Sequence, residues 1–130
     1  MESVVGSGEV YAQLARGLHF AGGTLTLLDV SPSTIWMSPV PRRLGFLRTG
    51  AFLDLWADVR LPGSPGVRRV EGTLALLDAD SRLAGDARLA LSNPRVTTSG
   101  LTYDVEVTTG LVPAGSGACV LFMDWDTASS

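Results

Sequence analysis

Residues 51–61 read Ala-Phe-Leu-Asp-Leu-Trp-Ala-Asp-Val-Arg-Leu, and every odd-numbered position in this stretch is aliphatic. Side chains alternate between the two faces of a strand with a period of two residues. The stretch therefore predicts a long β-strand whose aliphatic face covers the core. The other face would carry two aromatic and three charged side chains, which are Phe52, Asp54, Trp56, Asp58 and Arg60.

The remaining sequence predicts several more strands, separated by glycine and proline signals. Strands are expected over 9–20, 24–30, 34–37, 67–78, 83–92, 101–107 and 118–125. The stretch 51–61 should belong to one long strand or two shorter ones over 42–61, with bends at Gly45 and Gly50. Turns are expected at Gly22-Gly23, at 62–66 and at Asn93-Pro94, where the strand that starts at residue 83 should end. Seven or eight strands at this spacing predict an all-β fold, either an antiparallel β-sandwich or a small β-barrel. Residues 1–130 should form one domain with polar tails at 1–8 and 126–130.

Two segments of the chain resemble each other at a constant offset. Residues 17–29 and 66–78 are identical at seven of thirteen positions, and both end in Thr-Leu-X-Leu-Leu-Asp. One hypothesis is an internal duplication, with related halves at 17–65 and 66–115. The other is that this motif is simply typical of a buried strand followed by an Asx turn.

Composition excludes several classes of function. The net charge is −3, and the basic doublets Arg42-Arg43 and Arg68-Arg69 are too small for a nucleic-acid-binding face. All ten basic residues are Arg, which indicates a GC-rich source. The start of the chain lacks a signal-peptide pattern, and no apolar run is long enough to span a membrane. We therefore expect a protein that stays in the cytoplasm or joins a particle assembled there, with no membrane partner.

The sequence offers few groups that could carry out catalysis. On a strand, Asp54 and Asp58 would lie about 13 Å apart, which is too far for a paired-carboxylate site. His19 is the only histidine, and Cys119 lies in an apolar run that is typical of a buried, inert thiol. We expect no catalytic residues, no metal site and no cofactor, and this favours a non-enzymatic role.

Two functional hypotheses remain open from the sequence. Charged residues make up only 18% of the chain, which favours a surface partly covered by something else. The first hypothesis is a structural subunit that contacts protein partners or further copies of itself, in an oligomer or a larger particle such as a phage virion or an injection-type assembly. The alternative is a small barrel that binds a hydrophobic small molecule, or acts as a cyclase by shape alone. The candidate ligand or interface residues are those of the 51–61 face together with Trp36, Tyr103 and Trp125, and the direction in which their rings point distinguishes the two hypotheses.

Overall fold

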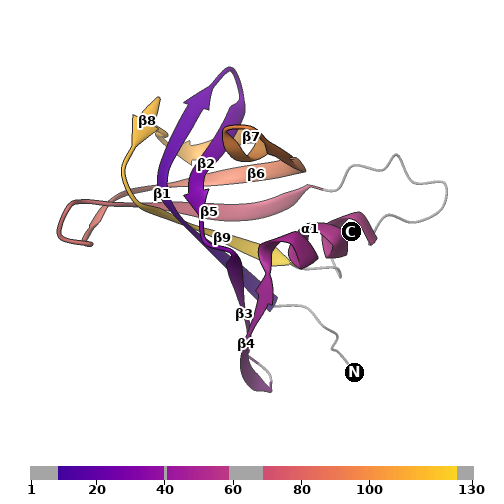
Figure 1. Ribbon diagram of the computed structural model, residues 1–130. Helices are drawn as coiled ribbons and strands as arrows, with labels where there is room; N and C mark the ends of the chain where they lie inside the picture. Colours follow the sequence, from indigo (N-terminus) through magenta and orange to yellow (C-terminus); the bar gives the residue numbers. More distant parts are fainter. Residues whose placement is uncertain (1–8, 40, 59–68, 126–130) are drawn as a thin grey trace.

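The computed structural model describes residues 9–39, 41–58 and 69–125, and it is built almost entirely of antiparallel strands (Figure 1). The prediction of an all-β fold is confirmed. The elements in chain order are β1 (Glu9–Ala21), β2 (Thr24–Val30), β3 (Ser33–Pro39), β4 (Arg42–Arg48), α1 (Thr49–Asp58), β5 (Val70–Leu77), β6 (Leu83–Thr97), β7 (Gly100–Gly110), β8 (Gly115–Ser116) and β9 (Cys119–Trp125). No helix in the described ranges is long and apolar enough to cross a membrane.

Six of the strands close into a ring. The order around the ring is β1, β2, β7, β6, β5, β9 and back to β1, and every neighbouring pair is antiparallel. The closing pair joins distant parts of the chain, because Ala15 of β1 lies opposite Cys119 of β9. One continuous sheet thus curves back on itself and encloses a core.

The strand β1 has two successive partners along one of its edges. Its second half pairs with β2, and its first half pairs with β3 at residues 10–12, while β9 occupies the other edge. Asp29, at a positive φ of 53°, and the proline at position 32 mark the bend between β2 and β3. From this bend, β2 remains in the ring, and β3 leaves it to form a hairpin with β4 that projects from the body (Figure 1).

The core fills the ring with aliphatic side chains from every strand. Its buried members include Leu18, Leu25, Leu27, Leu74, Leu76, Leu89, Leu91, Leu101, Cys119, Leu121 and Met123. In the segment 101–107 the apolar residues Leu101, Tyr103, Val105 and Val107 alternate with polar ones, which predicts that these four face the core, and the structure confirms it. Leu101 and Tyr103 are buried, and Val105 and Val107 pack against the core.

The predicted strand over 51–61 is wrong, because residues 49–58 form the helix α1. Phe52 and Trp56 are four residues apart, so a helix places both rings on one side, and they are 0% and 4% exposed. Residues 50–58 contain no β-branched side chain and are rich in Ala and Leu, which favours a helix. The expectation that Phe52 and Trp56 lie on the face opposite the core is also wrong, because both rings belong to the core.

The expected strand end at Asn93-Pro94 is wrong as well. The strand β6 runs through both residues to Thr97, and its register with β7 shifts between Ser92 and Arg95. Asn93 adopts a positive φ of 54°. A bulge can accommodate a positive φ and leaves one residue out of the ladder of backbone hydrogen bonds. The Asn-Pro pair therefore fits at the bulge without ending the strand.

The two similar segments place equivalent leucines in the core. Leu25 and Leu27 of β2 are buried, as are their counterparts Leu74 and Leu76 of β5. Residues 17–21 belong to β1, and their counterparts at 66–68 lie outside the described part of the chain, as does the predicted turn at 62–66. The duplication stays a prediction.

Gly72 provides a test of the packing inside the ring. A Cβ added there would lie 2.7 Å from a methyl of Leu91 and 2.8 Å from the carbonyl oxygen of Phe122. We expect Gly72→Ala to lower the free energy of unfolding by about 1–3 kcal/mol, since the backbone must shift. Gly85→Ala in β6 is the matched control, because its nearest contact would be an ordinary 3.8 Å. Urea denaturation of both variants measures the difference, and equal losses would contradict the packing described here.

Candidate interaction surface

The aromatic residues singled out in the sequence are largely inside the protein. Phe52 and Trp56 of α1 contact each other with ring centroids 5.9 Å apart. Phe52 also packs against Tyr11 at 5.1 Å, and Trp56 packs against Tyr103 at 5.9 Å. The helix thus inserts two rings into the core, where they meet tyrosines from β1 and β7.

The other residues of the predicted set are dispersed. Trp36 of β3 is partly buried and packs against the core, while Asp54 is exposed on α1. Asp58 ends α1 and Trp125 ends β9, but their side chains lie outside the described part of the structure, as does the whole of Arg60. The structure therefore does not gather these residues on one face.

A chain of buried hydrogen bonds links the ring to the base of the hairpin. The Tyr103 hydroxyl donates to Oε1 of Gln13 at 2.6 Å, and Nε2 of Gln13 donates to the Thr34 hydroxyl at 3.4 Å. The hydroxyls of Thr34 and Thr49 lie 2.9 Å apart, and Thr49 donates to the carbonyl of Ser31 at 2.9 Å. Gln13 and Thr34 are fully buried, so this chain satisfies polar groups that water cannot reach.

Burial changes the acidity of both core tyrosines. Desolvation raises the pKa of Tyr103 well above its usual range, although the hydrogen bond to Gln13 acts in the opposite direction. Burial also raises the pKa of Tyr11 to about 12, and the charge of Glu9 and its hydrogen bond at 3.3 Å add to the effect. Both phenols stay protonated at neutral pH and serve as structural groups.

The only cysteine of the chain is expected to be unreactive. Cys119 is 1% exposed, and burial raises the pKa of its thiol to about 11. At pH 8 only about 0.1% of such a thiol is ionised, and the thiolate is the reactive form. We expect the native protein to react with a disulfide reagent at least tenfold more slowly than the urea-unfolded protein. Equal rates in both states would contradict the burial of this side chain.

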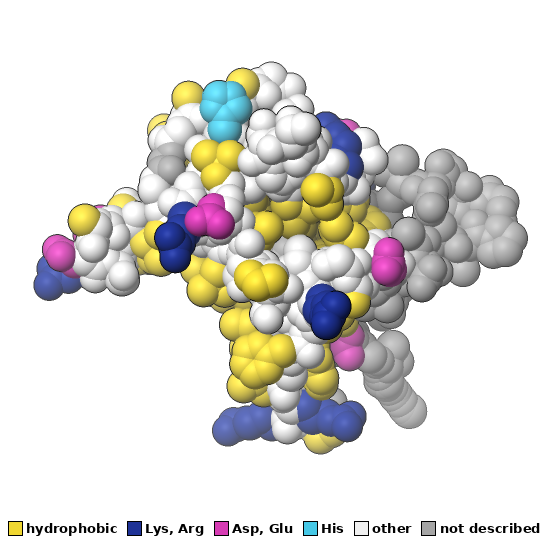
Figure 2. All heavy atoms as spheres, in the orientation of Figure 1, with side chains coloured by type: hydrophobic (Ala, Val, Ile, Leu, Met, Phe, Trp, Pro, Cys, Tyr) yellow, Lys and Arg dark blue, Asp and Glu magenta, His cyan; other side chains and the backbone are white. Residues whose placement is uncertain are grey.

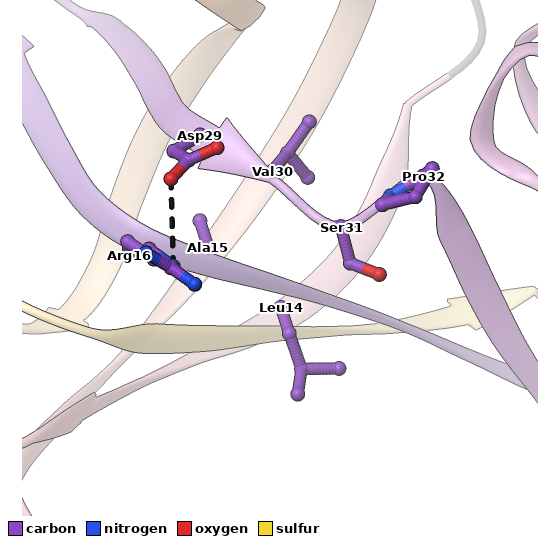
Figure 3. Close-up of a pocket in the computed structure, with 7 residues that line it drawn as sticks. All are labelled: Leu14, Ala15, Arg16, Asp29, Val30, Ser31 and Pro32. Atoms are coloured by element: carbon purple, nitrogen blue, oxygen red, sulfur yellow. Dashed lines mark ion pairs between the residues drawn. The ribbon is translucent and has the colours of Figure 1, made fainter.

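Two pockets in the described part of the structure are open hollows on the outside. One, of about 400 Å³, lies where β1 meets the bend between β2 and β3, and Figure 3 shows Arg16 and Asp29 facing each other there at 3.4 Å. The other, of about 740 Å³, lies beside the start of α1. Neither is lined by the core aromatics.

Among the described residues, no group of His, Cys, Asp and Glu is placed to hold a metal ion.

The most distinctive surface is the outside of four adjacent strands. Tyr11 and Gln13 of β1, like Leu121 and Met123 of β9, are buried on the inner side, so the residues between them point outward. The strand order here is β4-β3-β1-β9. Most of the outward residues are apolar, and we call these apolar residues the outer apolar face: Val10, Ala12, Leu14, Ile35, Met37, Leu44, Phe46, Val120 and Phe122.

The strand register sets these side chains next to one another in rows. One row runs across the four strands through Phe46, Ile35, Ala12 and Phe122, and the next runs through Leu44, Met37, Val10 and Asp124. Phe46 and Leu44 are 68% and 64% exposed, and Leu14 is 42% exposed. Ala12 in the centre is 3% exposed, and Ile35 and Phe122 on either side of it are half-buried. Exposed apolar side chains that gather on one side of a sheet are typical of a surface that meets another molecule.

The hairpin extends this face beyond the ring. In Figure 2 hydrophobic side chains gather on the lower projection, which is the β3–β4 hairpin, and basic side chains lie at its end. On the inner side of the hairpin the indole of Trp36 covers Gly45, where an added Cβ would lie 2.6 Å from the ring. An aromatic ring over a glycine stiffens a two-stranded segment.

Charges lie at opposite ends of the outer face. Arg42 and Arg48 flank the apolar residues of β4 and are exposed. At the other end, Asp124 of β9 lies directly opposite Glu71 of β5, and both are exposed. The face thus has arginines on β4 and two carboxylates at its other end, where the exposed Arg69 also precedes Glu71 by two residues.

Sequence reasoning missed this surface for an identifiable reason. Both sides of the segment 118–125 are apolar near its middle, and this pattern favours a strand that is covered on both faces. The exposed residues of β4 lie within a region that the sequence predicts as a long strand. Nothing in the sequence indicates that β3 and β9 lie on either side of β1.

Comparison with known proteins finds no matching family model, no significantly similar curated protein and no significantly similar solved structure.

Proposed function

We propose that this protein is a non-enzymatic subunit that binds another protein chain through the outer apolar face, within an oligomer or a larger assembly. The observation that carries the proposal is the row of outward apolar side chains across four adjacent strands. Leaving such side chains in water costs about 25 cal/mol per Å² of apolar area, so covering them stabilises a complex. Protein interfaces are built in this way, with an apolar centre and charges at the rim.

The alternative, a hydrophobic ligand inside the ring, has weaker support. The ring is closed and Trp56 and Tyr103 do lie inside it, as the ligand hypothesis expects. These rings contact each other and belong to one packed cluster with the surrounding leucines. A bound compound would have to take the place of side chains that already fill this space.

Site-specific photo-cross-linking tests the proposal. A photoreactive phenylalanine analogue is placed at position 46 on the outer face, and in a control protein at Val96 of β6, which is 74% exposed. We expect irradiation at high protein concentration, in the pure protein or in an extract of the source cells, to join position 46 to a protein chain. Position 96 should give little product, since it lies outside the face. Equal yields from the two positions, or none from position 46, would overturn the proposal.

A further inference from the structure

We propose that the partner is an extended segment of another protein, with alternating apolar and acidic side chains, which adds a strand to the free edge of β4. This inference rests on the proposed function, because it names the partner of the outer apolar face and the way in which it attaches. A strand added beside β4 would continue the sheet and place its apolar side chains next to those of this face. In recognition of this kind, backbone hydrogen bonds supply affinity and side chains supply specificity.

The sheet has its open end at β4. The strand order ends there, whereas the pairing of β1 with β2 closes the rest of the sheet into the ring. β4 pairs with β3 along one side, and no strand in the described ranges pairs with its other side. Figure 1 shows that α1 continues from one end of β4 away from the hairpin, so the helix does not lie along this edge. An unpaired edge presents a row of N–H and C=O groups that can bind a further strand.

The edge lacks two features that commonly prevent pairing, which are prolines and bulges. Residues 42–48 contain no proline, and the register between β3 and β4 is regular throughout. The indole of Trp36 covers Gly45 from the inner side and keeps the strand stiff. A partner would therefore meet an edge that is already formed, and little ordering of β4 would oppose binding.

The arginines of β4 indicate the charge of the partner. Arg42 and Arg48 lie on the outer side of the strand, one at each end of the exposed pair Leu44 and Phe46. The ion pairs found among the described residues do not include either arginine. Opposite charges on neighbouring strands stabilise their pairing. A strand with carboxylates near its ends and apolar side chains between them is complementary to this edge.

The same arginines disfavour a second copy of this chain as the added strand. If two β4 edges paired antiparallel over their whole length, Gly45 would face Gly45, and each Arg42 would lie opposite Arg48 of the other copy. Like charges directly opposite each other on neighbouring strands are destabilising. Repulsion of this kind rejects a wrong partner while the right one still binds.

A synthetic strand tests the edge. The probe is the capped peptide Glu-Thr-Val-Thr-Val-Glu-Glu, which runs antiparallel to β4 with glutamates opposite Arg42 and Arg48 and valines opposite Leu44 and Phe46. Because so short a strand buries little area, we expect a dissociation constant of about 10–500 µM in an NMR titration of isotope-labelled protein. The largest shifts should fall on the amides of residues 42–48. A protein that does not bind the peptide at about 1 mM would overturn the inference.

Methylation of the peptide backbone separates strand addition from contact through side chains alone. In an antiparallel pair, the N–H groups that bond to one neighbouring strand come from alternate residues. Two versions of the peptide are therefore made, each with methyl groups on one of the two alternate sets of amide nitrogens. One version should bind at least tenfold more weakly than the other. Equal affinities would show that the peptide does not pair with the edge.

Charge reversal tests the choice of partner. Arg42→Glu/Arg48→Glu should bind the acidic peptide at least tenfold more weakly, and it should prefer a peptide in which lysines replace the glutamates. Binding of the lysine peptide would not occur if the substitutions had simply damaged the fold. Val96→Glu is the control and should bind like wild type, since residue 96 lies on β6. A wild-type protein that binds both peptides equally would contradict the acidic partner.

The cross-link from position 46 separates this inference from the proposed function. A product with another protein, in the absence of any peptide binding, leaves the proposed function standing and removes strand addition. A product that joins only two copies of this chain has the same meaning. The absence of both the cross-link and peptide binding removes both proposals.

Discussion

Replacing Trp56 by Ala is expected to lower the free energy of unfolding by about 3–5 kcal/mol. The indole is 4% exposed and contacts the rings of Phe52 and Tyr103, so its removal leaves a large cavity at the contact between α1 and the ring. The loss includes the apolar burial and the aromatic contacts. Urea denaturation followed by circular dichroism provides the measurement.

The control for this variant lies on the same helix. Asp54→Ala changes an exposed side chain and should alter stability by less than about 0.5 kcal/mol. The pair also tests the helix itself. If residues 51–61 formed a strand with Trp56 and Asp54 on its outer face, the two substitutions would have similar and small effects. A loss below about 1 kcal/mol for Trp56→Ala would contradict the buried position of the indole.

Replacing Gln13 by Leu is expected to cost about 2–3 kcal/mol, because it leaves two buried hydroxyls without their partner. The Tyr103 hydroxyl loses its 2.6 Å acceptor and retains only the sulfur of Met123 at 3.8 Å, which is a weak acceptor. The Thr34 hydroxyl loses a donor. Thermal and urea denaturation measure the loss.

A second substitution distinguishes a lost hydrogen bond from a packing defect. Tyr103→Phe removes the hydroxyl that donates to Gln13, and alone it should cost about 1–2 kcal/mol. The double variant should be at least about 1 kcal/mol more stable than the sum of the two losses predicts, since the aliphatic side chain introduced at position 13 then faces no unpaired phenol. Strict additivity would show that the two side chains do not act together.

The alternation of apolar and polar residues correctly predicted several strands. It failed for residues 51–58, where the sequence fits both a strand and a helix. The segment 101–107 alternates in only one way, and it forms β7 with the expected inner face. Phe52 and Trp56, in contrast, share a face both in a strand and in a helix. Their surroundings decide between the two, because in the helix Phe52 contacts Tyr11 and Trp56 contacts Tyr103. Those partners come from distant parts of the chain, so local sequence could not supply the answer.

The outer apolar face was unpredictable for a related reason. Its rows join Phe46, Ala12 and Phe122, which become neighbours only after β1 has paired with β3 on one edge and β9 on the other. The sequence did reveal too few charges for a fully solvated surface, and this clue agrees with the exposed apolar side chains of β4. It could not say where the apolar surface lies, because strand order depends on pairings between residues far apart in the chain.

The closing pair of the ring has a consequence for biosynthesis. Local hairpins such as β3–β4 and β6–β7 can form as soon as their residues leave the ribosome, whereas β1 must wait for β9, its partner from the other end of the sheet. Until then the inner leucines and the free edge of β1 stay accessible to other chains. We expect this distant pairing to slow the acquisition of the native state.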